Sequence, residues 1–449
     1  MRKSRVVAHS KSILLALTAL PIAGGCGGPP MEGDQAGKVV SPHEAIYNGV
    51  VMASQANAGP LGVPLLYIGA TGCSAVVYNK YWLITAAHCF CSDGNACPVV
   101  DPQGAWVYWN TNIPGSHYAT ALQTSAGNQD GTLNILAGFR SPDISQDTAL
   151  VLLDPTSAGV YTPAIVAYTA NRYSNGHLVI YDLPNSNLIG QQVLAYGWGP
   201  TSSGGSFGSN LTRGYKNVAS ISPDNNYYYD SPYNNAGTSC NGDSGGPDFW
   251  WDGGGMQLTG THGEIGCAQG VGGRNNASQA FRTWVTNTAA TLPMAGSVSG
   301  EALSGWPASA ASDYNPFTSY SSLSFPSSAN NRNGLAVWLQ TYLATASTVN
   351  RVNLRARCSS FGYNPNAPSA PPSCVVNAFP ASYTVYVWNG AWNYGGTFTQ
   401  QPDNMGVVSL PIPAVANATA VRITPLQLGK DTNGTYYFQM AELQPAYDL

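Results

Sequence analysis

Three segments of the sequence carry a histidine, an aspartate and a serine in surroundings that suit nucleophilic catalysis. His88 lies in LITAAHC, Asp147 in SQDTALVLL and Ser244 in CNGDSGGP. A serine hydroxyl is a weak nucleophile until a base removes its proton, and the base itself must be oriented by a third group. These residue types therefore predict a triad in which Ser244 attacks, His88 is the base and Asp147 orients His88.

The segment around Ser244 also fits G-x-S-x-G, the nucleophile elbow of another hydrolase fold. That fold requires the chain order serine, acid, histidine. His262 is the only histidine after Ser244 in the sequence, and the interval between them is too short to hold the strands and helices of that fold. We therefore favour the order histidine, aspartate, serine.

In this order, the segments TAAHC, DTAL and GDSGGP closely resemble the three motifs of the trypsin/chymotrypsin family of serine proteases. The aspartate motif of the family is usually D-I-A-L, and Thr148 replaces the isoleucine here. The resemblance implies a chymotrypsin-like double β-barrel over residues 46–292 that hydrolyses peptide bonds in protein or peptide substrates without a cofactor. It also implies an oxyanion hole formed by the backbone N–H groups of Gly242 and Ser244.

The segment IYNG, which begins at Ile46, resembles the mature N-terminus of this family. In the family, the α-amine freed by proteolysis forms a buried ion pair with the aspartate that precedes the nucleophile, here Asp243. Such a pair keeps a buried carboxylate charged. The resemblance thus implies a zymogen that is activated by cleavage after Ala45.

The resemblance also places residues at the substrate pocket. Thr238 lies at the base of the S1 pocket, where a neutral hydroxyl cannot balance a buried cation. We therefore expect an apolar or small neutral P1 residue. Thr261 and Gly263 occupy the substrate-binding strand that usually reads S-W-G, and His262 replaces its tryptophan. We interpret His262 as a pocket-wall residue, with a catalytic role as the alternative.

The sequence contains nine cysteines, and eight remain if Cys26 is set aside. An even number in an exported chain indicates disulfides. A metal site is the alternative, but no histidine follows the cysteines at zinc-finger spacing. The resemblance implies the pairs Cys73–Cys89 and Cys240–Cys267. The remaining cysteines are then expected to pair as Cys91–Cys97, within a local loop, and Cys358–Cys374, within the second half of the chain.

The N-terminus predicts export. Basic residues precede the apolar run ILLALTALPIAG, which is too short to span a bilayer, so residues 1–26 are typical of a signal peptide. AGGC at its end resembles a bacterial lipobox, although Ala23 stands where leucine is preferred. A lipoprotein anchored through Cys26 and a plain secreted protein therefore remain alternatives. Residues 27–45 are expected to be a tether or pro-segment, and the mature protein is expected to be secreted or at the cell surface or outer membrane.

Composition supports an all-β chain. Charged residues make up only 9% of it and the net charge is −4, with no basic run beyond the N-terminus, which argues against a nucleic-acid partner. Short β-branched and aromatic runs alternate with Gly, Asn and Pro, as in barrels and sandwiches. One helix is expected over 276–292. The Pro/Gly/Ser/Ala-rich residues 293–312 are expected to be a linker.

The segments AVWLQTYL, YTVYVWNGAWN and TAVRITP in residues 313–449 resemble the discoidin (coagulation factor C-type, galactose-binding-like) β-sandwich. This resemblance implies a carbohydrate or cell-surface ligand. Trp388, Trp392 and Tyr394 are interpreted as core or edge residues, with stacking on sugars as the alternative.

The same resemblance implies a candidate site for structural calcium in the second half of the chain. Its oxygen donors suit a hard cation. The alternative is an ordinary polar turn and a surface glutamate. The expected ligands are Asp313, Asn315, Thr318 and Glu442.

Together these features predict an exported serine endopeptidase with a C-terminal adhesive module. One alternative is a non-enzymatic surface-binding protein on an inactive protease fold, against which the intact triad argues. A second alternative keeps the fold and makes it an esterase, which activity on peptide and ester substrates would distinguish.

Overall fold

The structure is a computed structural model of the 449-residue chain. It describes residues 50–54, 61–68, 71–89, 117–122, 131–141, 147–155, 173–174, 177–199, 207–208, 210–221, 227–229, 242–251, 253, 255–263, 279–314, 318–330, 336–361, 374–404 and 406–448. The expected signal peptide, tether, Cys26 and Ile46 lie outside these ranges. In the part that is described, no helix has the length and apolar character needed to cross a membrane.

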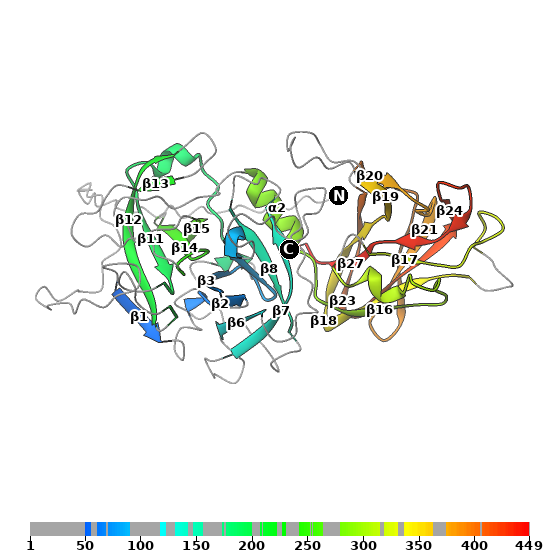
Figure 1. Ribbon diagram of the computed structural model, residues 1–449, viewed down its shortest axis with the longest axis horizontal. Coiled ribbons are helices and arrows are strands. Elements are labelled where there is room, and N and C mark those ends of the chain that lie inside the picture. Colours follow the sequence, from blue (N-terminus) through cyan, green and yellow to red (C-terminus); the bar gives the residue numbers. More distant parts are fainter. Residues whose placement is uncertain are drawn as a thin grey trace, which may run out of the picture. The chain divides into compact units, whose positions relative to one another are not determined.

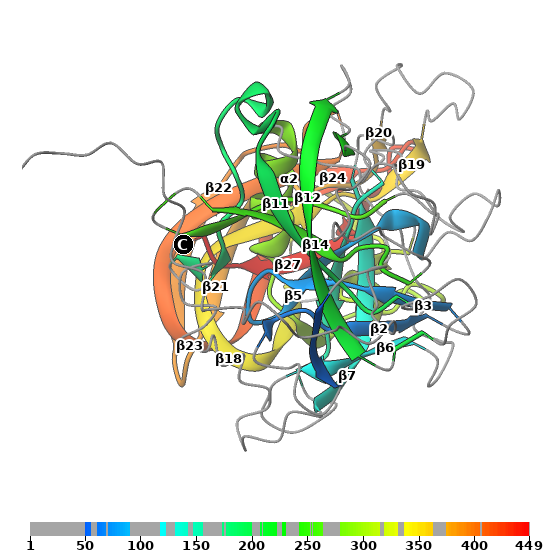
Figure 2. The same ribbon diagram turned by 90° about the vertical axis from the view of Figure 1, so that its left-hand side faces the viewer.

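The first sheet forms a nearly closed barrel. Its described strands are β2 (Leu65–Ile68), β3 (Thr71–Ser74), β4 (Val76–Val77), β5 (Trp82–Thr85), β6 (His117–Leu122), β7 (Gly131–Arg140) and β8 (Ala149–Leu153). They pair in the order β3-β2-β6-β7-β8-β5-β4, and Figures 1 and 2 show β2 and β6 side by side. Ala75 alone separates the two edge strands β3 and β4 in the chain, so the two edges of the sheet lie close to each other. Side chains of β5 and β8 are buried throughout, as strands inside a closed layer require.

The second sheet carries the nucleophile strand. Its described strands are β1 (Val50–Ser54), β11 (Gln192–Gly197), β12 (Asn210–Ile221), β13 (Tyr227–Tyr229), β14 (Pro247–Trp251) and β15 (Met256–Thr261). They pair in the order β1-β12-β11-β14-β15, and β13 pairs with β12. Two short strands, β9 (Tyr173–Ser174) and β10 (His177–Leu178), pair with each other. The sequence prediction of an all-β double barrel is confirmed.

The helix α2 (Gln279–Ala289) lies within the range predicted for a helix. Phe281, Trp284 and Val285 are buried on one face, as their spacing predicted. Residues 264–278, which hold the first part of the predicted range, lie outside the described residues.

The C-terminal part forms a β-sandwich. The strands of its main sheet are β16 (Met294–Ser299), β18 (Leu339–Arg355), β21 (Ser382–Trp388), β22 (Trp392–Phe398), β23 (Val407–Gln427) and β27 (Glu442–Ala446). They pair in the order β16-β18-β23-β21-β22, and β27 pairs with β18. Shorter pairs are formed by β17 (Tyr320–Ser321) with β26 (Gln439–Met440), β19 (Cys358–Phe361) with β20 (Cys374–Val376), and β24 (Gly429–Lys430) with β25 (Tyr436–Tyr437).

Residues 293–312 are not the linker that their composition suggested. Met294–Ser299 form β16, which pairs antiparallel with β18, and Ala308–Ala311 form the 3₁₀ helix η5. Small residues are compatible with an edge strand because ladder hydrogen bonds use only the backbone. Composition alone therefore could not distinguish this strand from a linker.

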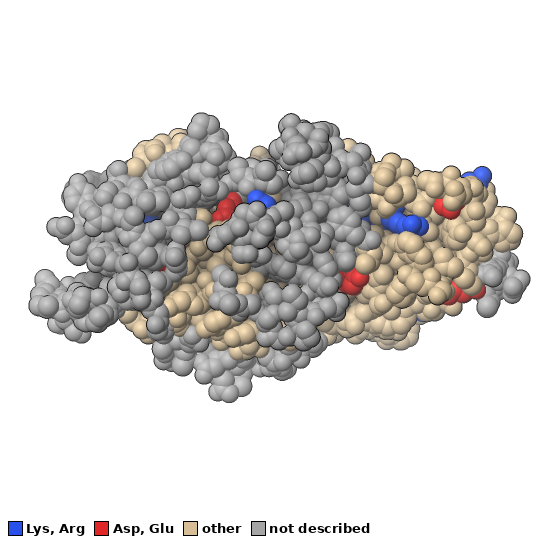
Figure 3. Space-filling model, in the orientation of Figure 1, with Lys and Arg blue, Asp and Glu red and all other residues tan. Residues whose placement is uncertain are grey.

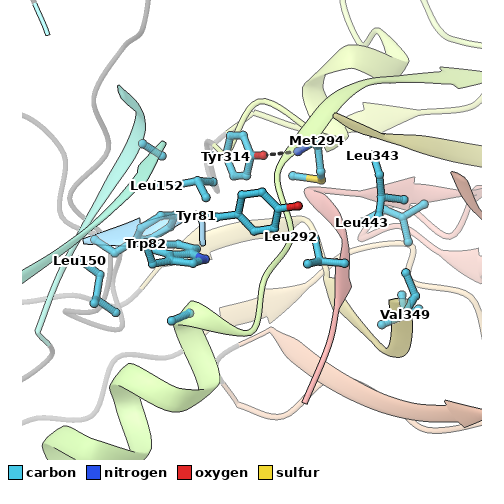
Figure 4. Close-up of a cluster of buried hydrophobic side chains, with 14 of the residues drawn as sticks. Tyr81, Trp82, Leu150, Leu152, Leu292, Met294, Tyr314, Leu343, Val349 and Leu443 are labelled. Carbon is cyan, nitrogen blue, oxygen red and sulfur yellow. Dashed lines mark hydrogen bonds between the residues drawn. The ribbon is translucent and has the colours of Figure 1, made fainter. Parts of the chain in front are cut away.

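One hydrophobic core extends from the first barrel into the sandwich. Figure 4 shows Trp82 and Leu152 in the same cluster as Leu292, Leu343 and Leu443. The Trp82 indole N–H donates to the carbonyl of Thr291 at 2.9 Å.

The described surface is sparse in charge, as the composition requires; Figure 3 shows few charged side chains among the described atoms on the face in view. Two of the four expected disulfides, Cys73–Cys89 and Cys358–Cys374, are confirmed. The other two expected pairs lie outside the described residues, with Cys91, Cys97, Cys240 and Cys267.

Candidate active site

His88 is held on a short 3₁₀ turn at the end of a buried strand. The turn η2 (Ala87–Cys89) follows β5, and Cys89 is linked to Cys73 of β3. The Thr85 hydroxyl donates to the carbonyl of Ser74 at 2.7 Å. The turn is thus tied to the barrel on both sides, while the His88 side chain itself remains 28% exposed.

Asp147 lies two residues before the start of β8 and contacts His88 twice. The backbone N–H of His88 donates to Asp147 Oδ1 at 2.8 Å, and His88 Nδ1 lies 2.5 Å from Asp147 Oδ2. Asp147 is itself fixed, because its carbonyl accepts the N–H of Ala87 at 3.1 Å. An ionised carboxylate can only accept a hydrogen bond, so this geometry places the imidazole proton on Nδ1.

Ser244 lies on the other side of the imidazole. His88 Nε2 is 2.8 Å from Ser244 Oγ, within reach for proton transfer. With its proton on Nδ1, the imidazole presents a lone pair at Nε2 to the serine hydroxyl. The structure therefore brings together the three residues that the sequence singled out.

The turn before Ser244 depends on glycine. Gly242 has φ +95°, and a Cβ there would lie 2.3 Å from the Phe207 ring. Among the described residues, the N–H groups of Gly242 and Ser244 have no hydrogen-bond acceptor. Both groups are thus available to donate to an oxyanion, as the resemblance implied.

Asp243 points away from the triad into the second barrel. Its side chain is fully buried and accepts the N–H of Gly199 at 2.7 Å. A Cβ on Gly199 would lie 2.6 Å from Asp243 Cγ, so this glycine permits the close approach. The expected partner of Asp243, the α-amine of Ile46, lies outside the described residues.

Sequence reasoning missed Ser74, the last residue of β3. Its N–H donates to the carbonyl of Ser244 at 2.8 Å, and its hydroxyl donates to the carbonyl of Gly242 at 2.8 Å. The same hydroxyl accepts the N–H of Trp198 at 2.9 Å. The only signal in the sequence was its position next to Cys73, which does not distinguish it from other serines.

His262 is not the pocket-wall residue that the sequence suggested. Its side chain is fully buried, with Nε2 2.7 Å from Asp248 Oδ1 and 3.1 Å from Lys216 Nζ. Burial lowers the pKa of Lys216, and the charges of Asp248 and Asp243 oppose that shift. The backbone of His262 also pairs with the loop after Ser244, accepting the N–H of Gly245 at 2.7 Å. His262 therefore belongs to the interior support of the nucleophile strand.

The substrate pocket is described only in part. Thr261 and Gly263 are buried beside β14, and Thr261 pairs with Pro247. Thr238 and residues 264–278 lie outside the described residues, so the predicted P1 preference stays a prediction.

The structure describes three of the four expected calcium ligands, Asp313, Thr318 and Glu442. Thr318 donates to Asp313 at 2.7 Å, Glu442 is buried in β27, and Asn315 lies outside the described residues. Within the described ranges, no group of three His, Cys, Asp or Glu residues could hold a metal ion. The buried Glu442 is not the surface glutamate of the alternative interpretation.

Comparison with known protein families matches residues 49–285, slightly more than half of the chain, to the family described as Trypsin. The chain belongs to the trypsin family. Enzymes of this family are serine-type hydrolases that use side chains and backbone N–H groups alone, without a cofactor. The match includes His88, Asp147 and Ser244.

Several solved structures similar to the C-terminal region are carbohydrate-binding modules. The family 32 module of NanJ from Clostridium perfringens, in complex with galactose, is 20% identical, with a TM-score of 0.26, and the match covers 35% of this chain and 98% of that one. A module from a family 31 glycoside hydrolase of the same organism is 18% identical, with a TM-score of 0.28 and coverages of 35% and 96%. A chitosan-binding module from Paenibacillus sp. IK-5 is 21% identical, with a TM-score of 0.25 and coverages of 35% and 98%.

No curated protein matches the chain.

Proposed function

We propose that this trypsin-family protein is an exported serine endopeptidase whose C-terminal module binds carbohydrate or a cell surface. One observation carries the catalytic part of the proposal. The His88 imidazole lies between the Asp147 carboxylate, 2.5 Å from Nδ1, and the Ser244 hydroxyl, 2.8 Å from Nε2. A surface-binding protein on an inactive protease fold has no need for this alignment.

The proposed reaction follows from that alignment. His88 Nε2 takes the proton of Ser244 as Oγ attacks the scissile carbonyl, and Asp147 stabilises the resulting imidazolium. The N–H groups of Gly242 and Ser244 donate to the oxyanion. His88 then protonates the leaving amine, and a water molecule activated in the same way hydrolyses the acyl-enzyme. Each such oxyanion donor contributes roughly 2.7–4 kcal/mol to the transition state in serine proteases.

The finer features are proposals drawn from the sequence. The neutral Thr238 supports a preference for an apolar or small neutral P1 residue. The N-terminal segment supports export to the cell surface, outer membrane or medium, with Cys26 as a lipid anchor in one form of the proposal. IYNG supports activation by cleavage after Ala45, and Asp313 and Glu442 support a structural calcium in the module.

Labelling with a fluorophosphonate tests the catalytic part. The protein, with its N-terminus freed at Ile46, is treated with the probe beside the Ser244→Ala variant. Labelling of the first and not of the second is expected, and no labelling of the processed wild type would overturn the enzyme proposal.

A substrate panel then separates the finer alternatives. Peptide anilides and the matching esters with Phe, Leu, Ala, Arg or Glu at P1 are compared. Hydrolysis of both substrate types, fastest with Phe, Leu or Ala, is expected. Turnover of esters alone would favour the esterase, and a preference for Arg would overturn the P1 assignment.

A further inference from the structure

The main sheet of the sandwich has an outer face that follows directly from its strand register. One row across the sheet holds Val298, Gln340, Arg422, Tyr386 and Tyr394, which are cross-strand partners in β16, β18, β23, β21 and β22. The next row on the same face holds Gly296, Tyr342, Ala420, Trp388 and Trp392. Residues between these rows point to the opposite face and form the core, for example Val421 and Val387, both fully buried.

This outer face is aromatic where a solvated sheet face is usually polar. The rows carry Tyr342, Tyr386, Trp388, Trp392 and Tyr394, and Trp338 precedes β18 on the same side. Tyr394 is 60% exposed, Tyr342 42% and Trp392 36%. Contiguous exposed aromatic side chains of this kind mark binding surfaces.

Arg422 lies at the centre of the face and is held rigidly. Its guanidinium is 4.3 Å from the Trp338 ring centroid and 4.2 Å from that of Trp392. Its Nε and Nη2 atoms both donate to Gln340 Oε1, at 3.1 and 2.7 Å. Among the described residues, Nη1 has no hydrogen-bond partner. The two rings and Gln340 therefore leave one edge of the cation for a ligand.

The charge of this face is uncompensated. Neither row contains an aspartate or a glutamate, and Arg422 is their single cation. Partial burial between two indoles lowers the pKa of Arg422, because the charged group has lost water. A carboxylate of a ligand placed at Nη1 would stabilise the charged guanidinium through a charge-assisted hydrogen bond.

The aromatic side chains define the rest of the ligand. The neighbouring strands β18, β23, β21 and β22 together span roughly 14 Å, because adjacent strands lie about 4.8 Å apart. Flat rings over that width suit the flat C–H faces of pyranose rings. In the second row the buried Ala420 of β23 lies between Tyr342 of β18 and Trp388 of β21, so aromatic side chains lie on both sides of β23.

We propose that this face binds a polysaccharide that contains uronic acids, with sugar rings stacked on Tyr342, Trp392 and Tyr394 and a carboxylate hydrogen-bonded to Arg422 Nη1. The inference rests on the proposed carbohydrate-binding role of the module and gives that role a site and a ligand class. It supports the interpretation of Trp392 and Tyr394 as sugar-stacking residues over their assignment to the core.

Affinity electrophoresis of the full chain with Ser244→Ala tests the proposal, so the result is independent of catalysis. The gels contain polygalacturonate or the same polymer with its carboxyl groups reduced to the neutral alcohol. At least tenfold tighter binding to the acidic polymer is expected. Arg422→Gln should abolish that difference, and Trp392→Ala should weaken binding to the acidic polymer by about tenfold.

The matched control is Arg357→Gln, because Arg357 also stacks on an indole, 4.1 Å from the Trp306 centroid, but lies in neither row. Its affinity should stay at the parent value, and melting curves of all variants establish that they fold. Equal affinity for both polymers, unchanged affinity in Arg422→Gln, or dimerisation that occupies this face would overturn the inference. If other polysaccharides bind and these variants do not change that binding, only the inference about this face is overturned. If no polysaccharide binds at all, the proposed carbohydrate-binding role of the module is overturned as well.

Discussion

The backbone N–H of Ser74 donates to the carbonyl of Ser244 at 2.8 Å, which joins the first barrel to the nucleophile. The Ser74 hydroxyl extends this connection, because it donates to the carbonyl of Gly242 and accepts the N–H of Trp198. One buried residue of β3 thus holds both ends of the three-residue segment whose N–H groups would bind the oxyanion. The geometry of the active site therefore depends on a residue that takes no part in the chemistry.

The variant Ser74→Ala tests this dependence. It leaves the buried Trp198 N–H and the Gly242 carbonyl without their partner, which should cost about 1–3 kcal/mol of stability. The catalytic turn should also lose alignment, so we expect kcat to fall by about tenfold or more in a chromogenic peptide assay, with KM little changed. Ser220→Ala, at an exposed position of β12, is the control. Wild-type kcat in Ser74→Ala would show that the hydroxyl does not position the turn.

Asp147→Asn should inactivate the protein without disturbing its fold. The backbone N–H of His88 donates to Oδ1, so the amide oxygen would take that place and the amide NH₂ would face Nδ1. The imidazole proton would then sit on Nε2, which could no longer accept the proton of Ser244. The same change lowers kcat by roughly 10⁴-fold in the reference enzyme of this mechanism. We expect a loss of that size in peptide hydrolysis, with Asp182→Asn, at an exposed site, as control; a loss below tenfold would contradict the assigned tautomer.

The sequence was sufficient to predict the features that local motifs determine. His88, Asp147 and Ser244 come together as expected, the two disulfides in the described part are correct, and α2 lies in its predicted range. Each of these has a recognisable residue pattern within a few positions of itself. The double barrel follows from many short strands together with the resemblance.

Features set by contacts between distant segments could not be predicted in this way. Ser74 contacts Gly242 across 168 positions of sequence, and no local pattern indicates that contact. His262 is buried together with its partners Asp248 and Lys216. Aspartate and lysine are usually exposed, so nothing in the sequence indicated that these two lie inside the barrel. The strand β16 was mistaken for a linker because an edge strand gains its pairing from β18, not from its own side chains.

Buried tyrosines should make the sandwich sensitive to alkali. Burial raises the pKa of Tyr314, Tyr320 and Tyr383 well above the ordinary value of about 10. Above pH 10 the unfolded chain loses these protons while the folded chain retains them, so stability that is complete below pH 10 is lost as pH rises further. Urea midpoints at pH 8 to 11, followed with tyrosinate absorbance, should show unfolding and ionisation together.

Tyr383→Phe provides the comparison for this pH dependence. It removes the hydrogen bond from the phenol to the Gln400 carbonyl at 2.7 Å, which should cost about 1 kcal/mol at every pH. It also removes one raised pKa, so the decline above pH 10 should be shallower than in wild type. A folded protein whose tyrosines all ionise near pH 10 would contradict the assignment.

The shared core of Figure 4 predicts that the barrel and the sandwich unfold together. Trp82 is fully buried and its indole donates to Thr291, while the Tyr81 hydroxyl is 2.8 Å from Thr345 Oγ1 of β18. Trp82→Phe leaves the Thr291 carbonyl without this donor and opens a small cavity, which should cost about 1–3 kcal/mol. Urea unfolding followed by fluorophosphonate reactivity and by near-ultraviolet circular dichroism should give one transition that moves to lower urea for both probes.

The matched control for this variant is Trp251→Phe, at a half-buried indole at the end of β14. It keeps the Thr291 contact, so its free energy of unfolding should stay within about 0.5 kcal/mol of the wild-type value. Two separate transitions in wild type, with only the reactivity of Ser244 shifted by Trp82→Phe, would mean that the core does not couple the two parts. A single shifted transition would mean that ligand contacts on the sandwich and substrate contacts at Ser244 stabilise the same cooperative unit, since anything that binds only the folded state raises its stability.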